Sequence, residues 1–195
     1  MEQDLVSTLS DERDLGQSVR ITETFMKGLH LLEPNVHDDD RGEFWRSFCA
    51  EELSLAGLSF QVCQSNVSVN RAAWTLRGLH RQRPPSDEAK ILTVIMGSAH
   101  VVILDLRSGS DSRLRHEAIQ IASGDRRSIL VPSGCATGFL TMEPNTVVHY
   151  QMGDHFQPEL YEGYRFDDPA FGIDWPSEPA VVSQRDATYP FFDLD

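Results

Sequence analysis

Residues 74–85, WTLRGLHRQRPP, place an imidazole among three guanidinium groups with no acidic residue between them. Arg77, Arg81 and Arg83 could bind an anion at the end of a strand, or could be solvated charges that keep a strand edge from pairing. Strict alternation along a strand puts Arg77 and His80 on opposite faces. Both can therefore face one ligand only if Gly78 allows a bulge.

His80 is the candidate general base of this segment, because an unperturbed histidine has a pKa of roughly 6.5. A lone histidine in a strand can equally be a structural residue. A catalytic one usually has a carboxylate that fixes its tautomer and stabilises the imidazolium. Spacing does not choose among the downstream candidates, which are Asp167, Asp168, Asp174 and Asp186.

Two further residues could take part in proton transfer. Lys90 precedes the apolar run ILTVIM, and Lys27 is the only other lysine of the chain. The Lys90 ammonium could stabilise an oxyanion in a pocket, or Lys90 could be a solvated residue at the start of a strand. Tyr150 alternates in phase with Val148 and Met152, and could be a proton donor or a core tyrosine with one hydrogen bond.

A metal site is not expected from these residues. Metal-dependent double-stranded β-helix enzymes usually present two histidines around one intervening residue, followed by a carboxylate. Here that pair would be His80 and Gln82, and glutamine is a poor ligand. We therefore predict neither a metal nor another cofactor.

The elements that would position these side chains are mostly strands. Short β-rich stretches recur with Gly, Pro and Asn between them, and Gly97-Ser98 predicts a hairpin turn. Residues 49–57 form the best helix candidate. This pattern is typical of an all-β sandwich or barrel and fits a double-sheet jelly roll. We expect one domain, residues 19–195, after an acidic N-terminal extension, residues 1–18, that we expect to be flexible.

The composition restricts the partners of the chain. It has 195 residues, of which 40% are apolar, and a formal net charge of −13 at pH 7. Nucleic acids and anionic membranes bind positive surfaces, so neither is an expected partner. No apolar run is long enough to span a bilayer. Cys49, Cys63 and Cys135 are widely spaced, which favours free thiols in a reducing cytoplasm.

Several motifs together resemble the dTDP-4-dehydrorhamnose 3,5-epimerase family. They occur in the order LLEPNVHDDDRGEFWRSF, TLRGLHRQ, AKILTVIMGSAHVVILDLRSGS, VPSGCATGF and GYRFDDPAFGIDWP. The resemblance implies a metal-free, cupin-type double-stranded β-helix, or jelly roll, with a few short helices. It also implies a homodimer that exchanges strands. The implied substrate is a nucleotide-diphosphate 4-keto-6-deoxy sugar.

The resemblance also implies roles in proton transfer. By position, His80 is similar to the family's base, Asp186 to its carboxylate partner, and Tyr150 to the acid on the opposite face. Lys90 is similar to the lysine that stabilises the enolate oxygen. This set makes chemical sense, because a 4-keto group acidifies the hydrogens on carbons 3 and 5 and the enolate then needs a cation.

A binding shell is implied as well, and part of it departs from the family. The residues at substrate-binding positions are Arg41, Arg46, Gln64, Asn66, Arg77, Thr137, Phe156 and Tyr161. Thr137 stands where a histidine is usual, and Arg46 and Tyr161 each replace a glutamate. Arg41 could reach the ligand of a neighbouring subunit, and Phe156 lies where an aromatic ring stacks on the nucleotide base.

We therefore predict an epimerase that inverts carbon 3, carbon 5 or both in deoxysugar biosynthesis. One alternative is a cupin 3,4-ketoisomerase of nucleotide sugars, which would leave carbon 5 unchanged. Another is a catalytically inactive nucleotide-sugar-binding protein, for which the missing histidine at Thr137 is the main support. Because the proton-transfer residues are intact while the binding shell differs, the sequence favours an active enzyme with an altered substrate.

Overall fold

The computed structural model describes residues 19–193 and confirms the predicted all-β jelly roll. Its helices are α1 (Ala50–Leu55) and α2 (Gln184–Ala187), with 3₁₀ turns at Ser123–Asp125 and Pro158–Leu160. Its strands are β1 (Val19–Glu23), β2 (His30–Pro34), β3 (His37–Asp39), β4 (Gly42–Phe44), β5 (Gln64–Asn70), β6 (Leu76–Gln82), β7 (Lys90–Met96), β8 (Ser98–Asp105), β9 (His116–Ala122), β10 (Ser128–Val131), β11 (Cys135–Thr141), β12 (Thr146–Met152) and β13 (Tyr161–Gly163).

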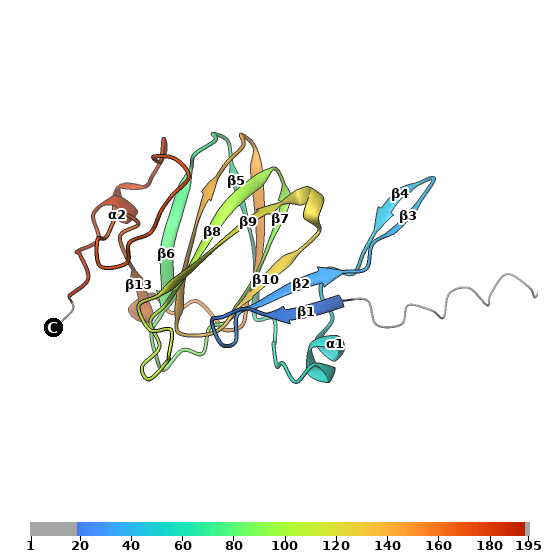
Figure 1. The fold of residues 1–195 in the computed structure, drawn as a ribbon, viewed down its shortest axis with the longest axis horizontal. Helices are drawn as coiled ribbons and strands as arrows, with labels where there is room; N and C mark the ends of the chain where they lie inside the picture. The colour runs from blue at the N-terminus through green and yellow to red at the C-terminus, as the bar shows by residue number, and fades with distance from the viewer. Residues whose placement is uncertain (1–18, 194–195) are drawn as a thin grey trace, which may run out of the picture.

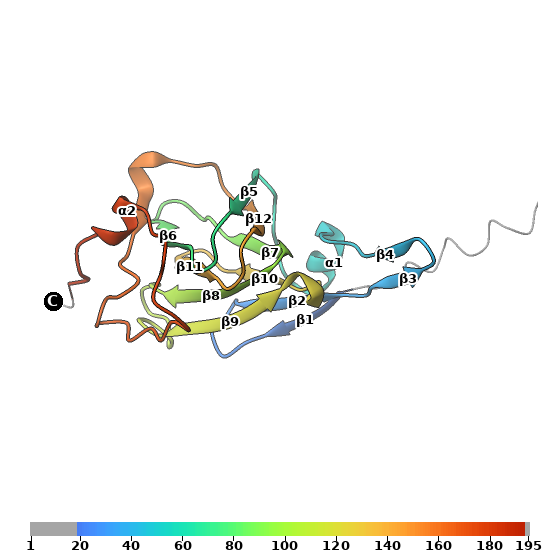
Figure 2. The ribbon, with the colours of Figure 1, turned by 90° about the horizontal axis from the view of Figure 1, so that it is seen from above.

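Two antiparallel sheets form the body of the domain (Figures 1 and 2). Within residues 19–193, one has six strands in the order β1-β2-β10-β7-β12-β5, and the other has five in the order β13-β6-β11-β8-β9. From β5 to β8 each successive strand joins the other sheet. The turn predicted at Gly97 is present, and this glycine has a φ of +76°. The predicted hairpin is wrong, because β7 and β8 on either side of the turn belong to different sheets and do not pair with each other.

The main apolar core lies between the two sheets. Its largest fully buried cluster combines residues of the six-stranded sheet, such as Val94 and Val148, with residues of the five-stranded sheet, such as Val101 and Ile103. We call the face of each sheet that carries this cluster its inner face. Since side chains alternate along a strand, membership of this cluster identifies which neighbours share the inner face.

The outer faces are covered by less regular segments. The predicted helix at residues 49–57 is confirmed as α1, whose Leu53 packs over Ile91 and Leu130 of the six-stranded sheet. Residues 164–192 cover the five-stranded sheet, where Phe171 packs with Val102. The β3–β4 hairpin extends away from both sheets (Figures 1 and 2).

The described part of the chain begins with β1 at Val19. The predicted extension, residues 1–18, lies outside the described residues. No helix within residues 19–193 is long and apolar enough to cross a membrane.

Candidate active site

A bulge in β6 brings Arg77 and His80 to the same face. His80 lies opposite Thr137 of β11, and Arg77 lies opposite Phe139, so three steps along β6 match two along β11. Gly78 has a φ of +113°, and a Cβ there would lie 2.5 Å from the Cα of Gly138. Glycine is thus required at this position by both the conformation and the close approach of β11. The bulge makes possible the shared face that strict alternation forbids.

Asp186 is the carboxylate that contacts His80. Its Oδ1 lies 2.7 Å from the His80 Nε2, although the two residues are 106 positions apart. The Ser183 side chain caps α2 by accepting the Asp186 N–H at 3.0 Å, which fixes where the carboxylate begins. The Asp186 Oδ2 also accepts a long hydrogen bond of 3.4 Å from the Gly78 N–H. The bulge and α2 together therefore hold the imidazole–carboxylate pair.

Two of the other candidate aspartates have partners away from His80. Asp167 forms an ion pair with Arg165 at 2.6 Å. Asp168 accepts the backbone N–H groups of Ala170 and Phe192, and so organises the C-terminal segment. Spacing did not identify which aspartate contacts His80, and the tertiary structure places Asp186 there.

The protonation states of the pair follow from its surroundings. Burial raises the pKa of Asp186, but the hydrogen bond and charge of His80, with the Gly78 and Ser183 bonds, outweigh it and leave the pKa below the usual value. Asp186 is therefore ionised at neutral pH, and its carboxylate can only accept hydrogen bonds. The His80 Nε2 must carry the hydrogen, which leaves Nδ1 as the basic nitrogen. The His80 side chain is 23% exposed, so a ligand can reach it.

Lys90 crosses from the six-stranded sheet to the strand that carries His80. Its Nζ donates to the His80 carbonyl oxygen at 3.0 Å and pairs with Glu88 at 3.2 Å. Glu88, only 5% exposed at its side chain, also accepts the Gln82 Nε2 at 2.9 Å. Lys90 is therefore a fixed, partly buried cation and not a solvated strand start.

Tyr150 lies on the opposite wall from His80. It belongs to β12, in phase with the fully buried Val148, and it packs against the inner cluster. Its backbone pairs with Leu92 of β7 and Asn66 of β5. His80 projects from the five-stranded sheet and Tyr150 from the six-stranded sheet, so a ring held between the sheets would meet them on opposite faces.

Polar residues of β5 line the same inner side. Gln64, Asn66 and Asn70 alternate with the exposed Val67 and Val69. Asn70 accepts the Arg77 Nε at 2.8 Å and thereby orients the guanidinium. Gln64 accepts the N–H of Phe156 at 2.7 Å.

An aromatic group continues from His80 toward the surface. The Tyr161 ring lies 5.2 Å from the imidazole and 5.5 Å from the exposed Phe156 ring. The Arg185 guanidinium stacks over Tyr161 at 4.6 Å. Burial raises the pKa of Tyr161, so this phenol stays neutral. The arrangement offers flat apolar surfaces and a cation beside the base.

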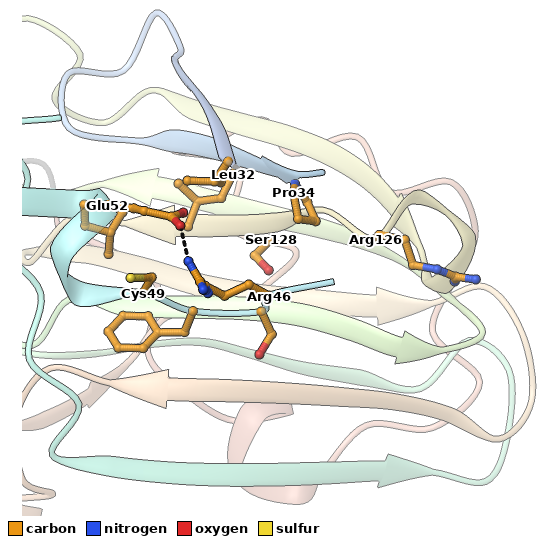
Figure 3. Close-up of a pocket in the computed structure, with 11 residues that line it drawn as sticks. Leu32, Pro34, Arg46, Cys49, Glu52, Arg126 and Ser128 are labelled. Carbon is orange, nitrogen blue, oxygen red and sulfur yellow. Dashed lines mark hydrogen bonds and ion pairs between the residues drawn. The ribbon is translucent and has the colours of Figure 1, made fainter. Parts of the chain in front are cut away.

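Arg41 and Arg46 lie apart from this group within the single chain. Arg41, at the end of the β3–β4 hairpin, is held by Asp39 at 2.5 Å. Arg46 lines a small pocket on the outer side of the six-stranded sheet, where its side chain is directed at Glu52 (Figure 3). The Arg46 Nη1 lies 2.5 Å from the Glu52 Oε1. The residues lining that pocket do not include His80, Lys90 or Tyr150.

Sequence reasoning did not single out Glu88, Asn70 or Arg185. Each acts on a predicted residue, and each contact depends on the sheet arrangement. Among residues 19–193, no three His, Cys, Asp or Glu side chains are grouped as a metal site requires. The absence of a cofactor stays a prediction.

Comparisons with known proteins agree with this geometry. Residues 23–193 match a family model described as dTDP-4-dehydrorhamnose 3,5-epimerase. A protein of that name from Methanothermobacter thermautotrophicus is 33% identical over 173 residues, or 87% of this chain and 92% of the relative.

Two solved structures place the similarity in three dimensions. The dTDP-4-dehydrorhamnose 3,5-epimerase of Bacillus anthracis, with TDP and PPi bound, is 32% identical at a TM-score of 0.86, covering 90% of this chain and 100% of that one. A 3'-monoepimerase from Streptomyces bikiniensis, in complex with dTDP-quinovose, is 28% identical at a TM-score of 0.81, covering 86% and 85%.

Proposed function

Because the chain belongs to the dTDP-4-dehydrorhamnose 3,5-epimerase family, we propose that it inverts carbon 3, carbon 5 or both of a nucleotide-diphosphate 4-keto-6-deoxy sugar. The enzyme is thus an isomerase of deoxysugar biosynthesis. One observation carries the proposal: His80, which contacts Asp186 of α2, lies on the five-stranded sheet opposite Thr137, and Tyr150 of the six-stranded sheet packs against the core between the two sheets. Inversion requires a base and an acid on opposite faces of the sugar ring.

The first step is removal of a proton next to the keto group. The His80 Nδ1 takes the hydrogen from carbon 3 or 5, and the electron pair of the C–H bond moves to the keto oxygen to give an enolate. Asp186 stabilises the imidazolium that forms, through the 2.7 Å contact on Nε2. Lys90, fixed beside the His80 backbone, supplies the positive charge for the enolate oxygen.

The second step returns a proton to the other face. Tyr150 donates its phenolic hydrogen to the same carbon as the enolate collapses to the ketone. The phenolate and the imidazolium then exchange protons with solvent, which restores the starting state. Because the two residues project from different sheets, the returned proton lies opposite to the one removed.

Other residues predicted from the sequence would bind the nucleotide-diphosphate part of the substrate. A diphosphate is the part of the substrate that a guanidinium binds best, and Arg77 is the one oriented by Asn70. Phe156 and Tyr161 offer ring faces for the nucleotide base. Gln64 fixes the backbone of Phe156 and thus the position of its ring.

We propose that the protein is a homodimer in the cytoplasm. In this dimer, Arg41 and Arg46 of one subunit contact the substrate that is bound to the other. The edge strand β5 exposes Val67 by 60% and Val69 by 59%, and the projecting hairpin exposes Phe44 by 64%. Apolar residues so exposed favour burial against another chain. The free Cys49, Cys63 and Cys135 support a reducing compartment. Val67→Asp should convert the dimer to monomer in analytical ultracentrifugation, whereas a wild-type monomer contradicts the proposal.

Proton NMR in deuterated water tests the activity, with dTDP-4-keto-6-deoxyglucose as the probe. Deuterium should enter carbon 3, carbon 5 or both, and His80→Asn should stop the exchange while circular dichroism shows an intact fold. Exchange at both carbons identifies a 3,5-epimerase, and exchange at carbon 3 alone a 3-epimerase. If the wild type exchanges neither carbon of the dTDP, GDP, CDP or UDP sugars, the proposal is wrong.

A further inference from the structure

Thr137 carries a buried hydroxyl beside the proposed base. Its Oγ1 has no hydrogen-bond partner among residues 19–193, and the residue is only 8% exposed. Thr137 lies directly opposite His80 in the pairing of β11 with β6. It shares the inner face with Cys135 and Phe139, which pack in the core cluster between the sheets. The hydroxyl therefore lies on the side of the sheet where the substrate must bind.

Thr141 lies on the same strand and face, but its buried hydroxyl is hydrogen-bonded within the protein and so has a structural role. Its Oγ1 accepts the Thr75 N–H at 2.9 Å and donates to the Ala72 carbonyl at 3.1 Å. Buried hydroxyls in folded proteins are nearly always bonded in this way, since leaving one without a partner costs free energy. The orphaned hydroxyl of Thr137 is the exception on β11, and a bound ligand can supply the missing partner.

The chemistry of the sugar limits which of its groups that partner can be. Around the keto carbon, carbon 5 carries a methyl group and the ring oxygen, and carbon 3 carries a hydroxyl. Lys90 occupies the place of the cation for the keto oxygen. A hydroxyl can both donate and accept, as the Thr137 side chain can, which makes carbon 3 the matching position.

We infer that the Thr137 hydroxyl binds the hydroxyl on carbon 3 of the sugar, and so makes this chain selective for 4-keto-6-deoxy sugars that retain it. The inference rests on the proposed function, because it takes its ligand from there. Thr137 then orients the ring so that the carbon to be deprotonated faces His80. A smaller polar side chain at this position still binds the same group.

The test compares two ligands on a protein that cannot turn them over. In the His80→Asn background, calorimetry measures the affinity for dTDP-4-keto-6-deoxyglucose and for its 3-deoxy analogue. Thr137→Val should weaken binding of the first about 2- to 12-fold, the value of one net hydrogen bond, and leave the second unchanged. Thr137→Ser should bind both as the parent does. Without ligand, Thr137→Val should keep or raise the Tm, because it removes a buried group without a partner.

Thr141→Val is the matched control. It should lower the Tm, since it breaks two bonds, and leave both affinities unchanged. If Thr137→Val weakens neither ligand, or weakens both equally, the inference is wrong even where deuterium exchange upholds the epimerase. If the ligand-specific loss appears in a protein whose wild type exchanges no deuterium, the inference holds and the proposed activity fails.

Discussion

Asp186→Asn tests the proposed division of labour in the base most directly. The carboxylate accepts from the His80 Nε2 at 2.7 Å with one oxygen and from the Gly78 N–H at 3.4 Å with the other. An amide has one oxygen and one NH₂ group, so it cannot accept both. If its NH₂ faces His80, the imidazole takes the other tautomer, in which Nδ1 carries the hydrogen and cannot act as a base.

The opposite orientation of the amide also weakens the base. With its oxygen facing His80, the tautomer is kept, but the imidazolium loses an anionic partner. A hydrogen bond to a charged group contributes about 1.5–3 kcal/mol, and about 1.4 kcal/mol corresponds to a tenfold change in rate. We therefore expect kcat to fall at least about tenfold in this orientation, and about 10²–10⁴-fold where general base catalysis is lost entirely.

The assay is deuterium exchange into the nucleotide sugar, with the Tm as a check on folding. Asp167→Asn is the control, because Asp167 forms its ion pair with Arg165 away from His80, and it should change the rate less than about twofold. The double variant His80→Asn with Asp186→Asn should be no slower than the worse single variant, since the two residues act as one unit. A folded Asp186→Asn protein that retains more than about a tenth of the wild-type rate refutes this reasoning.

Three further perturbations address the cation, the bulge and acid stability. Lys90→Met should slow deuterium exchange about 10²–10³-fold. It should also lower the free energy of unfolding in urea by about 3 kcal/mol, because Glu88 is left buried without its cation, and adding Glu88→Gln should restore stability but not activity. Gly78→Ala should lower stability by about 2 kcal/mol or more and abolish exchange, because its Cβ has no room, and a fully active variant would contradict the need for the bulge. Burial, with the charge of His116, lowers the pKa of His100, so the unfolded chain binds a proton that the folded chain does not. Stability should fall below pH 6.5 by up to about 1.4 kcal/mol per pH unit until the lowered pKa is reached, and urea titrations at several pH values should show His100→Leu to be less acid-sensitive.

The fold was predictable because its signals are local. Alternation of apolar residues, Gly97 at a turn and the helix before Gly57 can each be recognised within a few residues. The site was less predictable because its contacts are distant in sequence. Spacing alone did not show which of Asp167, Asp168, Asp174 and Asp186 meets His80, and only the resemblance to a known family indicated Asp186.

The bulge illustrates a different limit. Gly78 showed in the sequence that a bulge was possible, but glycine alone does not show which strand approaches it. The approach of Gly138 on β11 decides the matter, and it depends on the pairing of two strands far apart in the chain. Glu88 and Asn70 escaped notice for the same reason, since their roles come from the side chains they meet and not from their neighbours in the chain.

The two residues proposed to transfer protons come from different sheets, so the hydrophobic core between the sheets also determines how far apart these residues lie. The separation of His80 from Tyr150 is a distance between sheets, and packed side chains such as Val94 and Ile103 set it. Close-packed interiors are hardly compressible, so this spacing changes little as the molecule fluctuates. A core substitution that leaves the protein folded can still shift one wall against the other. Its first measurable effect would then be on the rate of proton transfer, before any loss of stability.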